Sequence, residues 1–223
     1  MDVIPRIRAA RWADKEPVAA IVADALHSGP LAQWLVPDPT CRRRILTDVA
    51  VIWVEHAMFF GDIQITDDLS AAAMGFHRYR SIPPPSNYRT RLADAAGPHA
   101  RQFELLDQLL TQARPPTEPH YHLAVLAVLP VARRRGIGAA MLTHHESRLD
   151  RIDMPSWTET IHGSQDVYRR HGYLPRPALT LPDGPVIAPM RRNPRPARGS
   201  WPDNTARPAT VTAPARPQSD AQR

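Results

Sequence analysis

The stretch "HLAVLAVLPVARRRGIGAAML", residues 122–142, decides the fold. Residues 122–128 are almost entirely apolar and rich in valine and leucine, which is typical of a buried strand. Three arginines and two glycines one residue apart follow, and an amphipathic run extends from Gly138 to about residue 151. The order predicts a strand, a cationic turn and a helix in direct succession.

The glycine turn fits only one of three anion-binding patterns. A P-loop requires a lysine and a Ser or Thr after its second glycine, and neither is present. The dinucleotide pattern needs a third glycine where Met141 stands, so it fits weakly. What remains is Arg-x-x-Gly-x-Gly from Arg133 to Gly138, where glycines allow close approach and amides at a helix start can hold a pyrophosphate. A purely structural tight turn is the alternative.

The elements around this stretch alternate between helical and strand patterns, which predicts a mixed α/β domain. Asp14 and Thr40 are the expected caps of two N-terminal helices. Helices are expected over residues 14–27, 40–60, 101–113, 138–151 and 165–171, and strands over 6–10, 62–66, 71–79, 122–128, 156–160, 178–181 and 186–190.

The charge is distributed unevenly along the chain. Residues 191–223 hold seven arginines and two aspartates, whereas residues 1–190 hold 21 basic and 20 acidic residues. The net charge of +6 therefore does not indicate a nucleic-acid partner. The proline-rich, apolar-poor end predicts one domain over residues 1–192 and a disordered basic tail over 193–223.

Several classes of protein are disfavoured by composition. The single cysteine, Cys41, excludes an internal disulfide, and no Cys/His spacing suggests a metal site. No signal peptide and no apolar run near 20 residues is present, so we expect a cytoplasmic protein with no membrane partner. The oligomeric state stays open between monomer and homodimer.

Two motifs together resemble the GCN5-related N-acetyltransferases, the GNAT family. The first matches the family's acetyl-CoA binding segment at Val128, Pro130, Arg133, Gly136, Gly138 and Ala139. The second, "DVYRRHGYLP", resembles the Tyr-x-x-x-Gly-Phe segment through Tyr168, Gly172 and Tyr173. The resemblance covers residues 5–192 and is strongest over 120–175. The segments "IRAARWADKEPVAAIVADAL" and "WTET" are most similar to puromycin N-acetyltransferase and its relatives.

The resemblance implies a GNAT fold, a mixed central sheet with splayed parallel fourth and fifth strands and helices on both faces. It also implies acetyl-CoA as the acetyl donor; the lack of a metal-binding spacing of Cys and His residues separately leads us to expect no metal. The pantetheine arm would lie along the backbone of Leu126, Ala127 and Val128, and the pyrophosphate would lie on the turn. The family's usual asparagine is absent, and Ser164 and Gln165 stand nearest to its position. The residues implied for the turn are Arg133, Arg134, Arg135, Gly136, Ile137, Gly138 and Ala139.

The resemblance also implies roles in catalysis. Tyr168 matches the family's proton donor to the coenzyme thiolate, and His122 stands where relatives place a base. Because His122 lies four residues before Leu126, we expect both on one face of the strand. Glu159 competes as the base or attracts a cationic acceptor, His120 could relay protons, and His162 is a weaker candidate base. Each of these side chains has a plain structural alternative.

We therefore expect an N-acetyltransferase that moves an acetyl group to a primary amine of a small molecule, such as an antibiotic or natural product, by direct attack. A catalytically silent acyl-CoA-binding regulator of the same fold is the alternative, and nucleic-acid binding is disfavoured. Six aromatic residues can form the acceptor cleft or belong to the core: Trp34, Trp53, Phe59, Phe60, Phe76 and Tyr79.

Overall fold

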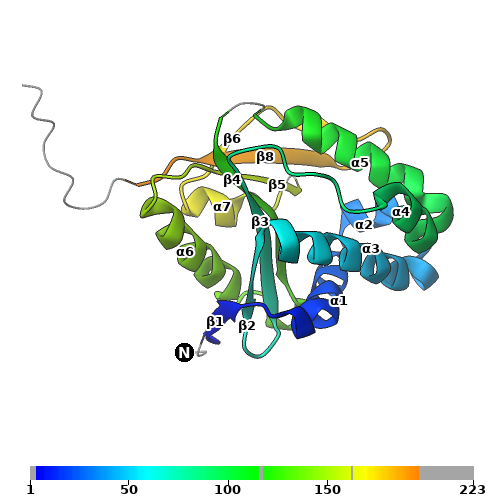
Figure 1. Ribbon diagram of the computed structural model, residues 1–223, viewed down its shortest axis with the longest axis horizontal. Helices are drawn as coiled ribbons and strands as arrows, with labels where there is room; N and C mark the ends of the chain where they lie inside the picture. Colours follow the sequence, from blue (N-terminus) through cyan, green and yellow to red (C-terminus); the bar gives the residue numbers. More distant parts are fainter. Residues whose placement is uncertain (1–3, 116–117, 162, 196–223) are drawn as a thin grey trace, which may run out of the picture.

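The computed structural model describes residues 4–115, 118–161 and 163–195 (Figure 1). Its strands are β1 (Ile7–Ala9), β2 (Asp62–Thr66), β3 (Ala71–Arg78), β4 (His120–Val128), β5 (Ser156–Ile161), β6 (Leu174–Pro175), β7 (Leu179–Thr180) and β8 (Val186–Arg192). Its α-helices are α1 (Lys15–Leu26), α2 (Pro30–Leu35), α3 (Pro39–Phe60), α4 (Tyr88–Ala96), α5 (Ala100–Ala113), α6 (Ile137–Asp150) and α7 (Asp166–Arg170). The 3₁₀ turns are η1 (Trp12–Asp14), η2 (Gly97–His99) and η3 (Pro130–Ala132).

In the described residues the strands form one mixed sheet in the order β1-β2-β3-β4-β5-β8-β6, with β7 paired to β8. Strands β4 and β5 run parallel, and the other described pairs run antiparallel. Helices α6 and α7 cover one face, and α1 and α3 cover the other (Figure 1). The expected mixed sheet with parallel fourth and fifth strands is confirmed.

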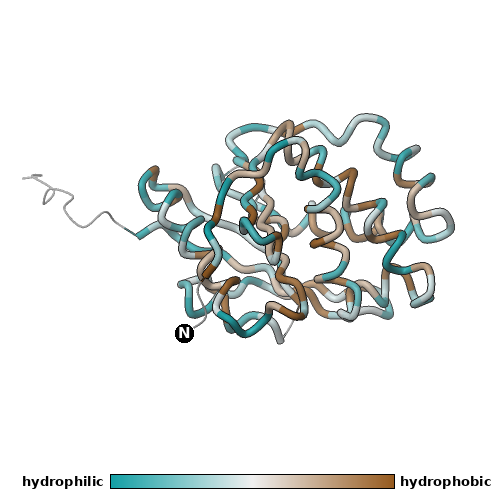
Figure 2. Tube along the Cα trace, turned by 90° about the horizontal axis from the view of Figure 1, so that it is seen from below, coloured by the Kyte–Doolittle hydropathy of each residue, from teal (hydrophilic) through white to brown (hydrophobic). Residues whose placement is uncertain are grey.

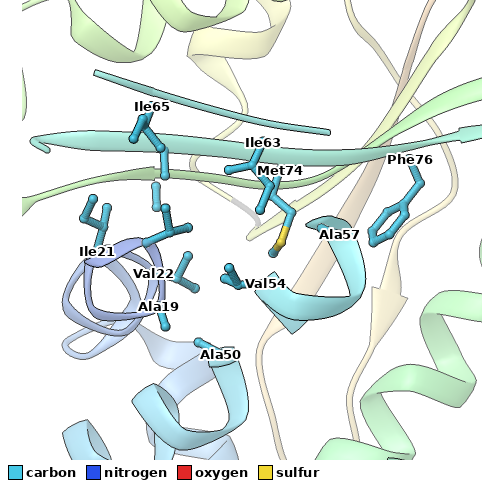
Figure 3. Packing of buried hydrophobic residues seen from close by; sticks show 13 residues of the cluster. Ala19, Ile21, Val22, Ala50, Val54, Ala57, Ile63, Ile65, Met74 and Phe76 are labelled. Atoms are coloured by element: carbon cyan, nitrogen blue, oxygen red, sulfur yellow. The ribbon is translucent and has the colours of Figure 1, made fainter. Parts of the chain in front are cut away.

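The apolar faces of the helices and strands explain these layers. Figure 3 shows Ile63, Ile65 and Met74 of the sheet pointing at Val22 and Val54, which belong to α1 and α3. A separate cluster, including Leu123 and Met141, lies between the sheet and α6. Hydrophobic segments run through the middle of the molecule and hydrophilic ones follow its outer turns (Figure 2). Apolar burial at about 25 cal/mol per Å² drives both contacts.

The beginnings of the two long N-terminal helices differ from the expectation. Asp14 precedes α1, but its carboxylate binds Arg8 and the Arg11 amide and makes no cap bond to that helix. Asp38, not Thr40, caps α3, and its Oδ1 accepts from the Thr40 amide at 2.9 Å. Because Pro39 has no N–H, the cap falls one residue before the proline.

A helical insertion separates β3 from β4. We expected one helix there, and the structure has α4 and α5, which join α2 and α3 in a third cluster that includes Leu92 and Phe103. Helix α2 and strand β6 were also not expected, because each is too short for a periodic pattern. The insertion places the end of α5 near the start of β4.

Strand β4 contains a β-bulge that reverses one expectation. Met74 of β3 pairs with Val125, but the next residue, Gly75, pairs with Leu123, so Ala124 is the extra residue. After the bulge Leu126 packs toward α6, whereas His122 stacks on Phe76 in the α1/α3 cluster. The expectation that His122 and Leu126 share a face is therefore wrong. Four residues preserve a face only in a regular strand.

Two expectations fall partly outside the described residues. Most of the expected tail, from residue 196 onward, lies there, as does His162. Among the described helices, none combines the length and the apolarity that crossing a bilayer requires.

Gly75 provides a test of the bulge. A Cβ at Gly75 would lie 2.4 Å from Tyr121 Cε1 and 2.5 Å from the His122 carbonyl oxygen. We expect Gly75→Ala to lower the free energy of unfolding by about 1–3 kcal/mol, because a buried site is overfilled. Urea denaturation measures the change.

The same substitution at Gly138 is the control. There a Cβ would lie 3.6 Å from Val128 Cγ2, at ordinary contact distance. Gly138→Ala should leave stability unchanged or slightly raised, since alanine favours a helix. Equal stability of the two variants would contradict the close packing at the bulge.

Candidate functional site

The parallel strands β4 and β5 separate partway along their length. They pair through Tyr121 with Ser156, His122 with Trp157 and Leu123 with Thr158, and the recorded pairing ends there. Thr158 Oγ1 donates to the Leu123 carbonyl at 2.9 Å at this last rung. Residues 124–126 are only half-buried, although β4 is a central strand. Beyond Leu123 and Thr158 no pairing of β4 with β5 is recorded in the described part of the chain, and we call this unpaired region the β4–β5 fork.

The backbone of β4 presents donors to this fork. The Leu129 amide donates to the Ser70 carbonyl at 2.9 Å, on the β3 side. Because N–H groups alternate sides along an extended strand, those of Val128 and Leu126 point away from β3, toward the fork. Ala127, which pairs with Ala72, presents its amide to β3. The bulge at Ala124 sets this alternation.

The glycine turn presents further amides close to the end of β4. Gly136 precedes α6 with φ of +80°, and Arg134 also has positive φ. The first main-chain bond of the helix runs from Ala140 to Gly136, and no side chain caps this end among the described residues. The amides of Ile137, Gly138 and Ala139 therefore lack partners within the helix. Together with the helix dipole they form a cradle for an anion.

The three arginines of the turn are exposed, and one of them is held by the backbone. Arg133 donates to the Ala25 carbonyl at 2.6 Å and to the Val128 carbonyl at 3.3 Å. Its guanidinium thus joins the end of α1 to the end of β4.

Tyr168 is buried on the α6/α7 face of the sheet beside the fork. Helix α7 holds it, and its ring meets that of Tyr173 edge to face at 5.6 Å. Burial raises the pKa of Tyr168 to about 12, and an interaction with the Thr158 side chain opposes part of the rise. Its hydroxyl is therefore protonated at neutral pH and lies beside the last rung of β4 and β5.

His122 and Glu159 form a buried pair on the opposite face. His122 Nε2 lies 2.7 Å from Glu159 Oε2, and the two side chains are 5% and 6% exposed. The pairing of His122 with Trp157 explains the contact, because Glu159 follows two residues later on the same face. Trp157 Nε1 donates to the other carboxylate oxygen at 2.7 Å.

The protonation of this pair follows from its surroundings. Burial lowers the pKa of His122, although Glu159 opposes this. Burial raises the pKa of Glu159, but His122, Arg114 and the Trp157 donor outweigh it and hold that pKa below its usual value. A neutral imidazole that donates from Nε2 to a carboxylate carries its lone pair on Nδ1. Nδ1 is buried and has no partner among the described residues.

The other candidates are less well placed. His120 lies on the same face as His122, and its Nδ1 contacts the Glu118 carbonyl at 2.7 Å. Gln165 is buried, and its side-chain oxygen accepts from Arg169 at 2.7 Å. Ser164 is exposed. Among the described residues, no group of three His, Cys, Asp or Glu side chains is arranged to hold a metal.

The six aromatic residues do not gather in one cleft. Only Phe76 stacks on His122, with ring centroids 6.5 Å apart. Phe59, Phe60 and Tyr79 are exposed, and Phe59 contacts Trp12 on the surface. Trp34 donates to the Pro182 carbonyl, away from His122, whereas Trp53 packs on Phe103 and borders both the cluster of Phe76 and that of Phe103.

Three contributors to the site were not foreseen: the Thr158 hydroxyl, the Trp157 donor and Arg114. Thr158 and Trp157 adjoin Glu159 in sequence, so the alternation along β5 could have indicated them. Arg114 lies 3.6 Å from Glu159, and it comes from the end of α5. No sequence signal shows where the end of an insertion will lie.

Comparisons with known proteins agree with this fold. The profile of the acetyltransferase (GNAT) family matches residues 25–173. A Corynebacterium glutamicum structure described as histone acetyltransferase HPA2 and related acetyltransferase has a TM-score of 0.65 and 21% identity, covering 88% of this chain and 100% of that one. Arylalkylamine N-acetyltransferase 2 of Aedes aegypti has a TM-score of 0.56 and 14% identity, covering 84% and 98%. The chain belongs to the acetyltransferase (GNAT) family.

Proposed function

We propose that the protein transfers an acetyl group from acetyl-CoA to a primary amine of a small molecule. The observation that supports this best is the arrangement at the β4–β5 fork. An imidazole with an unpartnered Nδ1 lies on one face of the sheet, and a protonated phenol lies on the other. Transfer from sulfur to nitrogen requires a proton acceptor for the amine and a donor for the departing thiolate.

The residues of the fork and the turn fit acetyl-CoA, which supplies an acetyl thioester when bound. The amides of Leu126 and Val128 would pair with the pantetheine arm as a neighbouring strand would. Gly136 adopts a conformation that disfavours side chains, and it leaves the amides of Ile137, Gly138 and Ala139 accessible to a pyrophosphate. Arg134 and Arg135 add positive charge around this cradle.

His122 acts as the proton acceptor in this proposal, through Nδ1. Glu159 is the positioning residue, because it holds Nε2 and stabilises the positive charge that the imidazole gains. Glu159 is poorly suited to be the base itself. Its pKa is held below the usual value, and its two oxygens already accept from His122 and Trp157. The two candidate bases thus become one unit.

Tyr168 acts from the other face. With a pKa of about 12, its hydroxyl keeps its proton at neutral pH and donates a hydrogen bond to the departing sulfur. An ordinary thiol has a pKa of about 8.5, well below that of Tyr168. The tyrosine therefore stabilises the thiolate by donating a hydrogen bond, and complete transfer of its proton is not required. Because Tyr168 and His122 lie on opposite faces of the sheet, the phenol does not donate its proton directly to the imidazole.

We also propose the class of acceptor, a small molecule with a primary amine. A small amine is consistent with the name of the similar Aedes aegypti structure, an arylalkylamine N-acetyltransferase. The resemblance to puromycin N-acetyltransferase favours an antibiotic or another natural product. In the alternative, a silent acyl-CoA-binding regulator, the buried His122–Glu159 pair would have a structural role only.

The direct test is release of free thiol from acetyl-CoA across a panel of amines. We expect turnover with at least one of arylalkylamines, amino sugars, aminoacyl nucleosides and amino acids. Tyr168→Phe should lower kcat by about 10²-fold, at the lower end of acid–base contributions, and leave the affinity for acetyl-CoA nearly unchanged.

Tyr173→Phe is the matched control. Tyr173 is buried in the same cluster as Tyr168, but its hydroxyl donates to Ser156 Oγ at 2.9 Å. This variant should keep the wild-type kcat. Acetyl-CoA binding without turnover of any amine would contradict the enzyme and favour the regulator, and unchanged kcat in Tyr168→Phe would remove Tyr168 as the donor.

The pH dependence tests the role of His122. Its pKa lies below the ordinary 6.5, so the imidazole is neutral above pH 6.5 and gains a proton only below it. Because a protonated imidazole cannot accept the proton of the amine, we expect the decrease in kcat/KM that is due to His122 to occur only below pH 6.5. In Glu159→Gln, the attraction that raises the pKa of His122 is lost, so this acid limb should move to lower pH.

The wild type and Glu159→Gln are assayed with the same amine. The ionisation of that amine then affects both pH profiles equally and does not contribute to the shift between them. An acid limb at the same pH in both would mean that another group titrates. His122→Gln should remove the limb and lower kcat by about 10²- to 10⁴-fold.

A further inference from the structure

Two arginines lie near the His122–Glu159 pair without hydrogen-bond partners among the described residues. Arg78 ends β3, where it pairs in register with His120, and its guanidinium carbon lies 5.4 Å from the centre of the Phe76 ring. Arg114 follows α5, and its side chain is 18% exposed. The Nε atoms of both are buried and unpartnered in the part of the chain that the structure describes.

Such guanidinium groups are costly to bury alone. An arginine carries five N–H donors, and a buried donor without a partner loses its hydration without compensation. Burial lowers the pKa of Arg78, and the positive charge of Arg114 lowers it further. Glu159 opposes part of this effect, and an anion bound beside both guanidinium groups would stabilise them further.

The carboxylates near these two arginines do not accept hydrogen bonds from them. Glu159 accepts hydrogen bonds from His122 and Trp157, and it forms an ion pair with Arg114 Nε at 3.6 Å that is too long to be a hydrogen bond. Asp107, the other acidic residue close to Arg114, accepts from the Tyr88 hydroxyl. Both guanidinium groups therefore keep donors for a further oxygen ligand.

We propose that Arg78 and Arg114 bind a carboxylate of the acetyl acceptor, so that the acceptor is a small amine that also carries a carboxylate. This inference rests on the proposed function. Guanidinium forks match carboxylates in geometry. Arg78 pairs with His120, two residues before His122, which is about 7 Å along a strand. The amine and the carboxylate of one small molecule can span that separation.

The arrangement also suits the chemistry of the amine. Two nearby cations disfavour the protonated form of a bound amine, and only the neutral form attacks the thioester. Arg78 and Arg114 would thus fix the acceptor by its carboxylate and favour its reactive form. Both are positioning residues for the acceptor.

The test uses matched acceptors in the thiol-release assay. Glycine, β-alanine, 4-aminobutyrate and phenylalanine are each compared with the corresponding carboxamide. We expect the preferred aminocarboxylate to exceed its carboxamide in kcat/KM by at least 10-fold. Arg78→Gln and Arg114→Gln should each lower kcat/KM for the carboxylate by about 10- to 100-fold, mainly through KM, and less than about 3-fold for the carboxamide.

Arg89→Gln is the control, because Arg89 lies on α4 in the same insertion with its side chain 92% exposed. It should leave both acceptors unaffected. Arg114→Lys keeps the charge without the fork and should restore part of the preference. Thermal unfolding of each variant separates a loss of folding from a loss of recognition.

A second measurement does not depend on turnover. Calorimetry with the N-acetylated aminocarboxylates and their carboxamides, in the presence of coenzyme A, reports the carboxylate site directly. No thiol release from any amine would contradict the proposed function, while preferential binding of the N-acetyl carboxylates would still support the arginine site. Equal use and equal binding of carboxylates and carboxamides, or a preference that survives both Gln substitutions, would overturn this inference.

Discussion

The candidate site exists because hydrogen bonding between β4 and β5 ends partway along the two strands. Two parallel strands in a buried sheet would ordinarily pair along their whole length, since unpaired main-chain groups are costly. Here the recorded pairing ends at Leu123 and Thr158, while β5 continues to pair with β8 as far as Ile161. The amides of β4 beyond that point need another partner. A ligand with amides of its own can take the place of the missing strand.

The bulge at Ala124 determines which main-chain amides of β4 face the fork. If β4 ran through Ala124 as a regular strand without a bulge, the alternation would turn the amides of Val125 and Ala127 toward the fork in place of those of Leu126 and Val128. The same residue lets His122 face α1 and α3 while Leu126 faces α6. One inserted residue therefore sets both the main-chain donors and the side of the sheet from which an acceptor would approach. The glycine turn follows at the end of the same strand.

Much of this could be predicted from the sequence, because the decisive stretch is local. The apolar run, the glycine turn and the helix follow one another over 21 residues, and periodicity shows each of them. His122 and Glu159 were competing candidates for one role. The structure makes them partners, because the pairing of β4 with β5 brings residues 37 positions apart onto one face.

What could not be predicted depends on contacts that no local pattern shows. The bulge is hidden because Ala124 lies within a uniformly apolar run, so a shift of register leaves no trace in the sequence. Arg114 reaches Glu159 only because the α4–α5 insertion packs on α2 and α3. The sequence left open whether the aromatic residues form a cleft or belong to the core, and three of the six, Phe59, Phe60 and Tyr79, lie on the surface. Composition shows such residues but not their neighbours.

The most direct test of the fork is amide hydrogen exchange, followed residue by residue by NMR with and without coenzyme A. We predict that exchange at Leu126 and Val128 slows by at least about 10-fold when coenzyme A binds, because their N–H groups acquire partners. Ala127 should not change, since its amide already faces β3. Slower exchange at Ala127 in place of its two neighbours, or no change at all three, would contradict the account.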